Sequence, residues 1–340
     1  MRYIVIGAGA VGGTIGGRLA QSGHDVVLVA RGAHLAALQR NGLRLITASG
    51  TFAQAIPTVE GPAAIGELGP DDVLILAVKS QDTAGAAREW AAMPVAGGGV
   101  AGDRIPIVCA QNGVDNERMV QRLFRTVYGL CVWLPATHLE PGVVITNGAP
   151  LSGILIVGRY PHGVDPVVEQ IGADLSRSVF DAPVVDDVMR WKYGKLLKNL
   201  GNALDALLGD EAAKSPKTTA ELWQECEAEG KAALAAAGIA YNTDDERRAL
   251  QGDRMEIQTI AGAPRAGGST RQSLVRGTGS VETDYLNGEI ALLGRLNGVP
   301  TPLNDLLQRL VTDYARNQRA PGGSSPAGLR ALLGAAHAQD

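Results

Sequence analysis

The chain has 340 residues, with 31 Lys or Arg, 35 Asp or Glu and a formal net charge of −4 at pH 7. A chain of this length accommodates about two domains with buried cores. The negative net charge argues against a nucleic-acid partner. A hydrophobic content of 45% excludes a disordered chain, and no apolar run approaches the ~20 residues that a membrane span needs.

The first half of the chain alternates apolar runs with helix-like stretches. Continuous apolar strands joined by crossover helices are typical of a parallel sheet covered on both faces. Strand-like runs between 127 and 158 extend the same sheet. We therefore expect an α/β fold, with a Rossmann-type parallel-sheet domain over residues 1–185. Strands are predicted at Tyr3–Ile6, Asp25–Ala30, Val73–Val78 and Ile105–Ala110, and helices at Val11–Ser22, Asp82–Met93 and Asn116–Phe124.

The second half shows the 3.6-residue apolar spacing of helices and few strand signals. We expect an all-α C-terminal domain over residues 186–320. Residues 321–340 are rich in Gly, Ser, Ala and Pro, which predicts a flexible tail with a short helix at Ala327–Ala335. The other predicted helices are Asp186–Leu208, Thr218–Ala237, Asp244–Ala261, Glu282–Leu296 and Leu303–Asn317.

A glycine-rich loop joins the first strand to the first helix. Residues 7–12 read GAGAVG, which matches the pattern GxGxxG. Gly7 permits a tight turn, Gly9 lets the backbone approach a pyrophosphate, and Gly12 allows the helix to pack on the strand. An ordinary glycine turn is the alternative. The residues predicted to bind a dinucleotide here are Gly7, Ala8, Gly9, Ala10, Val11 and Gly12.

Polar residues follow three of the predicted strands at their carboxyl ends, where parallel sheets bind ligands. Arg31 follows the second strand, and an arginine at this place favours the 2′-phosphate of NADP(H) over NAD(H). Lys79 is expected to meet cofactor phosphate or ribose. Asn112, in Gln111-Asn112-Gly113, suits a nicotinamide ribose or a substrate carbonyl. A surface arginine, a surface lysine and an Asn-Gly turn remain the alternatives.

One predicted helix carries a line of polar residues. Three of the seven lysines of the chain lie between 192 and 198. Lys195, Asn199 and Asn202 share one face, because residues four and seven apart are neighbours on a helix. This line is a candidate for substrate binding, and a solvated helix face is the alternative.

Five motifs in order along residues 1–315 give the chain a resemblance to the ketopantoate reductase (2-dehydropantoate 2-reductase) family. That family has an N-terminal Rossmann domain and a helical C-terminal domain, and it reduces 2-dehydropantoate to (R)-pantoate with NADPH, on the way to pantothenate and coenzyme A. The motifs are the glycine loop, Ala77-Val78-Lys79, Gln111-Asn112-Gly113, Trp191-x-x-x-Lys195-Leu196-x-x-Asn199, and residues 281–288, VETDYLNG.

The resemblance implies roles for single residues. Lys195 matches the catalytic lysine of the family, Asn199 its substrate-binding asparagine, and Asn112 the asparagine that touches cofactor and substrate. Glu282 matches a glutamate near the lysine and the cofactor, with a catalytic and cofactor-binding role. Arg31 and Lys79 match cofactor-binding positions.

One substrate position aligns in two ways, and two others depart from the family pattern. The serine that binds the substrate carboxylate aligns with Ser269 or with Thr270, depending on the anchor chosen, and Ser269 is preferred slightly. A second asparagine is expected at position 203, where this chain has Ala203, with Asn202 one place earlier. The stretch Leu204–Lys217 also lacks the asparagine expected for a further substrate contact. These departures weaken the assignment of ketopantoate as substrate and leave a 2-oxo acid or ketone reductase intact.

The sequence-based hypothesis is an NADPH-dependent ketopantoate reductase with Lys195 as general acid. The alternatives are an NADPH-dependent reductase of another 2-oxo acid or ketone, and a non-catalytic NADP(H)-binding sensor. The partner is a small-molecule 2-oxo acid, and the apolar helices could mediate a homodimer or fill a core. Three scattered cysteines indicate reduced thiols in a cytoplasmic protein, and no metal is expected. The five histidines show no ligand spacing and are interpreted mostly as loop or surface residues: His24, His34, His138, His162 and His337.

Overall fold

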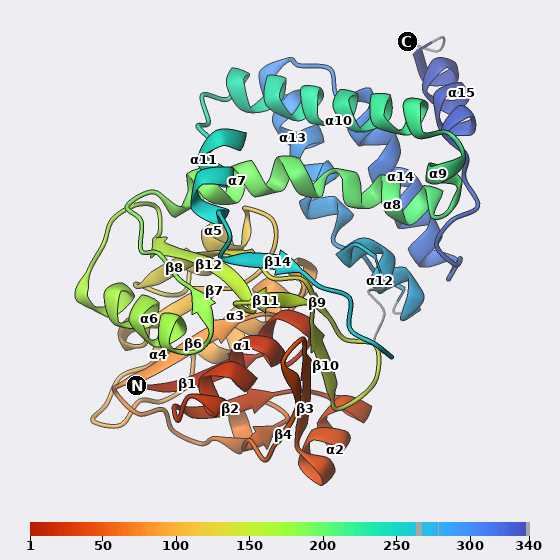
Figure 1. Ribbon diagram of the computed structural model, residues 1–340. Helices are drawn as coiled ribbons and strands as arrows, with labels where there is room; N and C mark the ends of the chain where they lie inside the picture. Colours follow the sequence, from red (N-terminus) through yellow and green to blue (C-terminus); the bar gives the residue numbers. More distant parts are fainter. Residues whose placement is uncertain (263–266, 278, 338–340) are drawn as a thin grey trace. The chain divides into compact units, whose positions relative to one another are not determined.

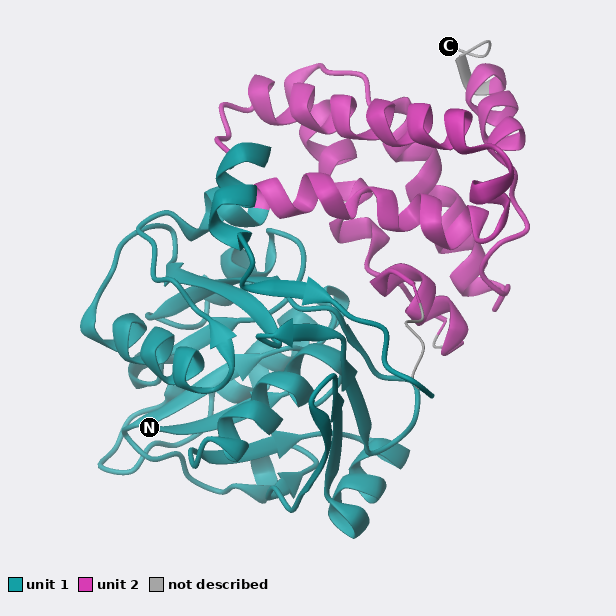
Figure 2. Ribbon diagram, viewed as in Figure 1, with its two compact units in different colours: residues 1–192, 242–265 teal, residues 193–241, 266–340 magenta. Residues whose placement is uncertain are grey.

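The computed structural model describes residues 1–262, 267–277 and 279–337 (Figure 1). The chain forms two compact units (Figure 2). The first comprises Met1–Lys192 with the described part of Asn242–Arg265, and the second comprises Tyr193–Tyr241 with the described part of Ala266–Asp340. This division differs from a single boundary near residue 185, because a segment after residue 241 belongs to the first unit.

Eight strands of the first unit's described residues form one sheet, in the order β13-β12-β8-β7-β6-β1-β2-β5. Neighbouring strands are parallel except β12 and β8, which are antiparallel. The parallel sheet expected from the sequence is therefore present. The strands are β1 Arg2–Ile6, β2 Asp25–Val29, β5 Thr58–Val59, β6 Asp72–Leu76, β7 Ile107–Cys109, β8 Val127–Trp133, β12 Gly153–Arg159 and β13 Phe180–Asp181.

Alternate residues of the central strands enter two cores, one on each face of this sheet. In β1, Tyr3 and Val5 pack with helices α1 and α6, whereas Ile4 and Ile6 pack with α3 and α5. Strands buried on both faces explain why these runs are apolar throughout rather than alternating. The covering helices are α1 Ala10–Gln21, α6 Pro166–Arg177, α3 Thr83–Ala91, α4 Ala101–Arg104 and α5 Asn116–Gln121.

Two smaller sheets complete the first unit. One has the order β4-β3-β10-β9, and the other pairs β11 with β14. The elements are β3 Leu43–Thr47, β4 Gly50–Gln54, β9 Ala136–Thr137, β10 Val143–Thr146, β11 Gly148–Pro150 and β14 Met255–Ile257, with α2 Gly32–Asn41, η1 Pro62–Ala64, η2 Ser80–Asp82 and α11 Asp244–Gln251.

The helix predicted at Asp244–Ala261 is wrong in its second half. Helix α11 ends before Gly252, whose φ is +48° and therefore favours glycine. Strand β14 follows and pairs antiparallel with β11, about a hundred residues earlier in the chain. This pairing partner is distant in sequence, so the local apolar spacing could not indicate it.

The second unit is helical, as expected. Helix α10 packs against α13, α14 and α8, and α8 also packs against α12 and α14. The predicted helix Asp186–Leu208 is divided into α7 and α8, with Leu200 between them. The elements are α7 Val188–Asn199, which begins in the first unit, α8 Gly201–Leu208, α9 Glu211–Lys214, α10 Pro216–Ala236, α12 Ser269–Val275, η3 Thr283–Tyr285, α13 Asn287–Asn297, α14 Pro302–Arg316 and α15 Pro326–His337.

Helix α15 occupies the segment expected to be a flexible tail. Its Leu329 and Leu333 are buried, Arg330 is paired with Glu225, and the helix contacts α10 and α14. Part of the tail is thus packed, because two leucines four residues apart form one apolar face.

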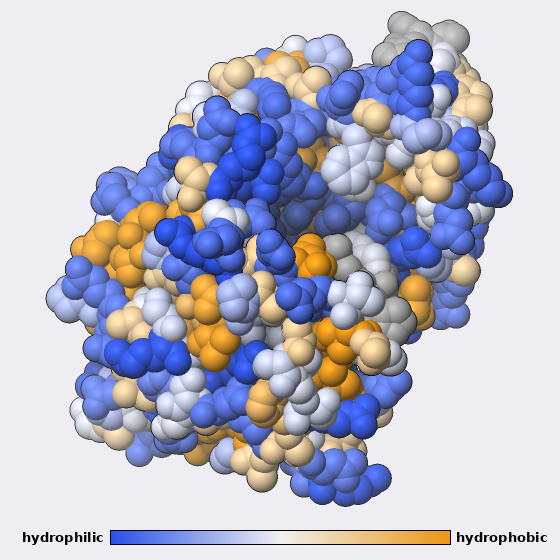
Figure 3. All heavy atoms as spheres, viewed as in Figure 1, coloured by the Kyte–Doolittle hydropathy of each residue, from blue (hydrophilic) through white to orange (hydrophobic). Residues whose placement is uncertain are grey.

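Hydrophilic side chains dominate the surface visible in Figure 3, and hydrophobic residues form small separate groups there. Among the described residues, no helix combines the length and the apolar character that crossing a membrane requires.

Candidate active site

The glycine loop has the backbone geometry that close approach of a ligand requires. Gly7 has φ +100°, and a Cβ at Gly12 would lie 2.1 Å from the Gly7 carbonyl oxygen. A Cβ at Gly9, the N-cap of α1, would meet no atom within 4 Å. The backbone at Gly9 is therefore open, while Gly7 and Gly12 are held by close packing. This cradle fits a phosphate at the N-terminus of α1.

His34 of α2 holds the same loop from the side. Its Nε2 lies 2.8 Å from the Ala8 carbonyl oxygen, and its Nδ1 accepts a hydrogen bond of 2.9 Å from the Gly142 backbone N–H. The centroid of the His34 ring lies 4.2 Å from the centroid of the His138 ring. Burial lowers the pKa of His34, and the bond to Ala8 partly opposes this. His34 is thus a half-buried helix residue, an exception to the interpretation of the histidines as mostly loop or surface residues.

Arg31 and Lys79 lie where sequence reasoning expected them, after β2 and β6. Arg31 is the N-cap of α2, and its side chain is 73% exposed. Its guanidinium lies 3.6 Å from the Glu89 carboxylate, which is also exposed. Lys79 is half-buried and precedes η2. An exposed guanidinium beside an exposed carboxylate gains little from that pair, so Arg31 is able to bind another anion.

Asn112 lies in a turn that side chains fix from two elements. Its backbone carbonyl accepts hydrogen bonds from Asn116 Nδ2 at 2.9 Å and from Ser80 Oγ at 3.4 Å. The next residue, Gly113, has φ +81°, which favours glycine. The Asn112 side chain is half-buried and follows β7. The turn is therefore held through its backbone.

In the second unit, Lys195 and Asn199 are both half-buried and lie one turn apart on α7. At the end of α7, the Leu200 carbonyl accepts a hydrogen bond of 3.2 Å from Asn287 Nδ2. Asn287 is buried and also bonds Asn304 at 2.9 Å. This asparagine belongs to the motif at residues 281–288, and it fixes the junction next to Asn199.

The structure brings Asn202 and Ser269 together. Asn202 Nδ2 lies 3.4 Å from Ser269 Oγ, and the neighbouring Gly268 N–H bonds Asp205 at 2.8 Å. Thr270 and Ala203 are buried, whereas Ser269 is half-buried. The hydroxyl of Ser269 at the start of α12 and the side-chain amide of Asn202 on α8 are therefore adjacent.

Glu282 is buried at the start of η3. The carboxylate lies near enough to Arg276 to influence it: burial lowers the pKa of Arg276, and the charge of Glu282 opposes that fall. Arg276 also bonds Ser273 at 3.2 Å. Sequence reasoning missed this arginine, because no motif marks it and its closeness to Glu282 arises from the fold.

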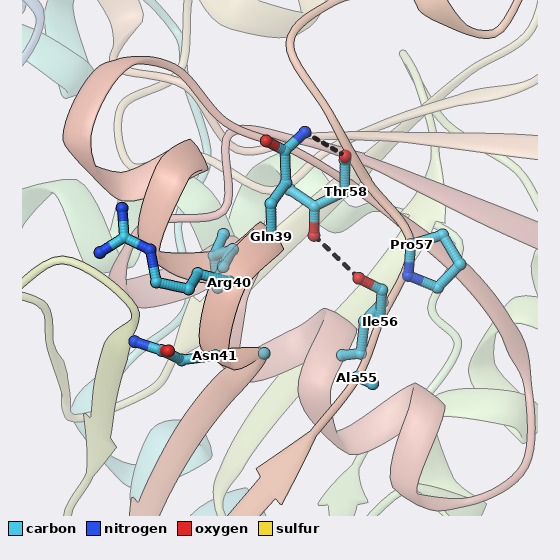
Figure 4. A pocket seen from close by; sticks show the side chains of 9 residues that line it. Gln39, Arg40, Asn41, Ala55, Ile56, Pro57 and Thr58 are labelled. Atoms are coloured by element: carbon cyan, nitrogen blue, oxygen red, sulfur yellow. Dashed lines mark hydrogen bonds between the residues drawn. The ribbon is translucent and has the colours of Figure 1, made fainter.

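Among the described residues, no group of three or more His, Cys, Asp or Glu could hold a metal ion. A pocket of about 560 Å³ lies between the end of α2 and residues 55–58 (Figure 4), where Gln39 bonds the Thr58 carbonyl at 3.1 Å. None of the predicted site residues lines it.

Two family models match the chain, one for each part. Residues 3–162 match "Ketopantoate reductase PanE/ApbA", and residues 187–315 match "Ketopantoate reductase PanE/ApbA C terminal". The chain belongs to the ketopantoate reductase family. It is thus a member of an oxidoreductase family, and the resemblance seen in its motifs is confirmed.

Relatives within the ketopantoate reductase family match over nearly the whole chain. A 2-dehydropantoate 2-reductase of Pyrococcus horikoshii is 28% identical over 317 residues, which cover 92% of this chain and 96% of the relative. A PanE/ApbA family ketopantoate reductase of Ralstonia eutropha JMP134 has a solved structure with a TM-score of 0.76, 28% identity, and coverage of 94% of this chain and 100% of that chain.

The fold of the family is shared more widely. A structure of D-mandelate dehydrogenase with NADH and anilino(oxo)acetate has a TM-score of 0.76 at 22% identity, covering 94% of this chain and 100% of that chain. At this level of identity the likeness concerns the fold.

Proposed function

We propose that this chain is an NADPH-dependent 2-dehydropantoate 2-reductase. The observation that carries this proposal is the match over 92% of the chain to a 2-dehydropantoate 2-reductase, combined with an open glycine cradle at the start of α1. The reaction would form (R)-pantoate for pantothenate and coenzyme A biosynthesis, in the cytoplasm.

A nicotinamide dinucleotide fits the residues of the first unit. Residues 7–12 would hold the pyrophosphate, because Gly9 leaves room for it and the N-terminus of α1 offers backbone N–H groups. Arg31 would bind the 2′-phosphate, and this more highly charged anion would replace the Glu89 carboxylate as its partner. Lys79 would bind phosphate or ribose, and Asn112 the nicotinamide ribose or the substrate. When bound, this cofactor supplies the hydride.

Lys195 supplies the proton in this proposal. Reduction of a ketone places a hydride on carbon and a proton on oxygen. The Lys195 ammonium would bond the C2 carbonyl oxygen, stabilise the developing alkoxide and donate that proton. We also infer, from the family resemblance, that the buried Glu282 carboxylate lies near Lys195, where it would favour the ammonium form in which the reaction must begin.

The substrate would be oriented by amides and hydroxyls. Asn199 lies one turn from Lys195, and the pair Asn202–Ser269 offers an amide and a hydroxyl 3.4 Å apart. These groups suit a carboxylate and a hydroxyl. Thr270 is the weaker candidate, because its side chain is buried.

The first experiment is Lys195→Ala, assayed for oxidation of NADPH with 2-dehydropantoate. Losing a positioned general acid is expected to lower kcat by about 10²–10⁴-fold. The dissociation constant for NADPH, measured by fluorescence, should change little, because the proposed cofactor ligands are unaltered.

Lys198→Ala is the matched control. Lys198 lies on the same helix and pairs with Glu227 at 3.0 Å, so its loss should leave kcat near the parent value. Turnover by Lys195→Ala close to the parent's would remove Lys195 from the mechanism.

Arg31→Ala tests the preference for NADP(H). Hydrogen bonds to charged groups contribute about 1.5–3 kcal/mol, so the KM for NADPH should rise about 10–100-fold while that for NADH changes little. Arg40→Ala, an exposed arginine on the same helix, is the control. Equal effects on NADPH and NADH would contradict the 2′-phosphate assignment.

A different 2-oxo acid or ketone is the second candidate substrate. The observation that favours it is the buried Ala203 at a position where the family has an asparagine. A panel of 2-oxo acids assayed with NADPH separates the two, since the preferred substrate has the highest kcat/KM. Binding of NADPH without turnover of any member would instead support a non-catalytic sensor.

A further inference from the structure

A lysine and a glutamate form a buried ion pair in the first unit, outside the residues given a role above. The side chains of Lys192 and Glu117 are 2% and 0% exposed. Lys192 Nζ donates a hydrogen bond to Glu117 Oε1 and another, of 3.1 Å, to the backbone carbonyl of Gln111. Lys192 is on α7, and Glu117 is on α5.

The Gln111 carbonyl begins the turn that carries Asn112. The rest of this turn is fixed by a chain of side-chain hydrogen bonds. Gln111 Nε2 donates to Thr83 Oγ1 at 2.6 Å, Thr83 donates to Asn116 Oδ1 at 2.8 Å, and Asn116 donates to the Asn112 carbonyl at 2.9 Å. Lys192 is therefore the charged member of a network that holds both sides of the turn.

Stability of the core alone does not account well for a buried Lys192–Glu117 pair. Taking two charges out of water is costly, and apolar side chains of similar volume commonly stabilise a core as well as a buried pair does. Burial raises the pKa of Glu117, and the charge of Lys192 opposes that rise. Apolar residues would fill the same space, but they could not donate a hydrogen bond to the Gln111 carbonyl.

We propose that Lys192, held in place by Glu117, is a positioning residue that fixes the Gln111 carbonyl and thereby the orientation of Asn112. The functional consequence rests on the proposed function, in which Asn112 binds the nicotinamide ribose or the substrate. Lys192 precedes Lys195 by one turn of α7, so the helix that carries the proposed acid also anchors the Asn112 turn.

Two variants separate positioning from stability. Lys192→Met removes the donor and leaves Glu117 buried alone, so this variant should unfold at lower urea concentration than the parent. Lys192→Met/Glu117→Leu removes both charges, and its unfolding midpoint should return toward the parent value. Neither variant can donate to the Gln111 carbonyl. If the single variant fails to fold, the double variant still decides.

The first measurement is hydrogen exchange of the peptide covering residues 110–116, without cofactor. Exchange is expected to be at least about 10-fold faster in both variants than in the parent, because the turn opens more often. Lys198→Met, on the same helix, should exchange at the parent rate. Parent-like exchange in the double variant would overturn the proposal, because the pair would then serve stability alone.

The second measurement is the dissociation constant for NADPH. Both variants should bind NADPH about 10-fold more weakly, while their kcat at saturating cofactor falls less. Parent-like affinity in the double variant would overturn the link between the turn and the cofactor. A parent protein that binds no NADPH would refute the proposed function, and the exchange of residues 110–116 would still decide whether Lys192 positions the turn.

Discussion

The imidazole ring of His34 contacts the glycine loop, and its two hydrogen bonds require one tautomer of the neutral ring. Nδ1 accepts from the Gly142 N–H, so the proton of the neutral ring is on Nε2, where it can be donated to the Ala8 carbonyl. A protonated ring would carry a hydrogen on Nδ1 as well, facing the Gly142 N–H. The neutral ring therefore suits this site, in agreement with the lowered pKa of His34.

This arrangement predicts a loss of stability in mild acid. The pKa of His34 is lower in the folded protein than in the unfolded chain, whose histidines have a pKa of about 6.5. The unfolded chain therefore binds more protons between the two pKa values, and the free energy of unfolding falls as the pH drops from about 7 toward 5. Urea unfolding at a series of pH values measures this slope.

His34→Gln serves as the reference for that prediction. A glutamine can keep a donor toward the Ala8 carbonyl and does not titrate, so the slope between pH 7 and 5 should be shallower than in the parent. Comparing the two slopes cancels the contributions of the other titrating groups. Identical slopes would show that His34 does not titrate differently in the folded and unfolded states.

At the scale of helices and strands, local signals were sufficient for elements that the chain encodes in one run. The apolar runs beginning at Tyr3, Asp25 and Val73 became β1, β2 and β6, because strands buried on both faces need no alternation. The glycine loop also carries a local signal, because residues 7–12 match GxGxxG between a strand and a helix. These strands, and the backbone geometry of the glycine loop in the candidate site, were predictable.

Elements and contacts that depend on distant partners were not predictable in this way. Strand β14 exists through its pairing with β11, and the helical spacing around it indicated the wrong structure. The Asn202–Ser269 contact joins α8 to α12, a helix absent from the sequence prediction. His34 and the Lys192–Glu117 pair carry no motif, because their partners are a backbone carbonyl and a side chain far away in sequence.

At the scale of the whole molecule, each unit is assembled from separate segments of the chain. The first unit includes the later segment that carries α11 and β14. The second unit includes both the part of α7 after residue 192 and the C-terminal helices. Composition alone suggested a flexible end, since glycine, serine and proline precede α15. The apolar face of α15 outweighs that composition, because burying leucine side chains stabilises a docked helix.

Two leucines of α15 test whether this helix is docked at the end of the chain. Leu329 is 1% exposed and Leu332, on the same helix, is 49% exposed. Leu329→Ala should lower the free energy of unfolding by about 2 kcal/mol, a value limited by the docking energy of α15, whereas Leu332→Ala should change it by less than about 0.5 kcal/mol. Urea unfolding of both variants measures the difference. Equal, negligible effects would mean that α15 does not pack on α10 and α14 in solution, and that the flexible tail expected from composition was the better description.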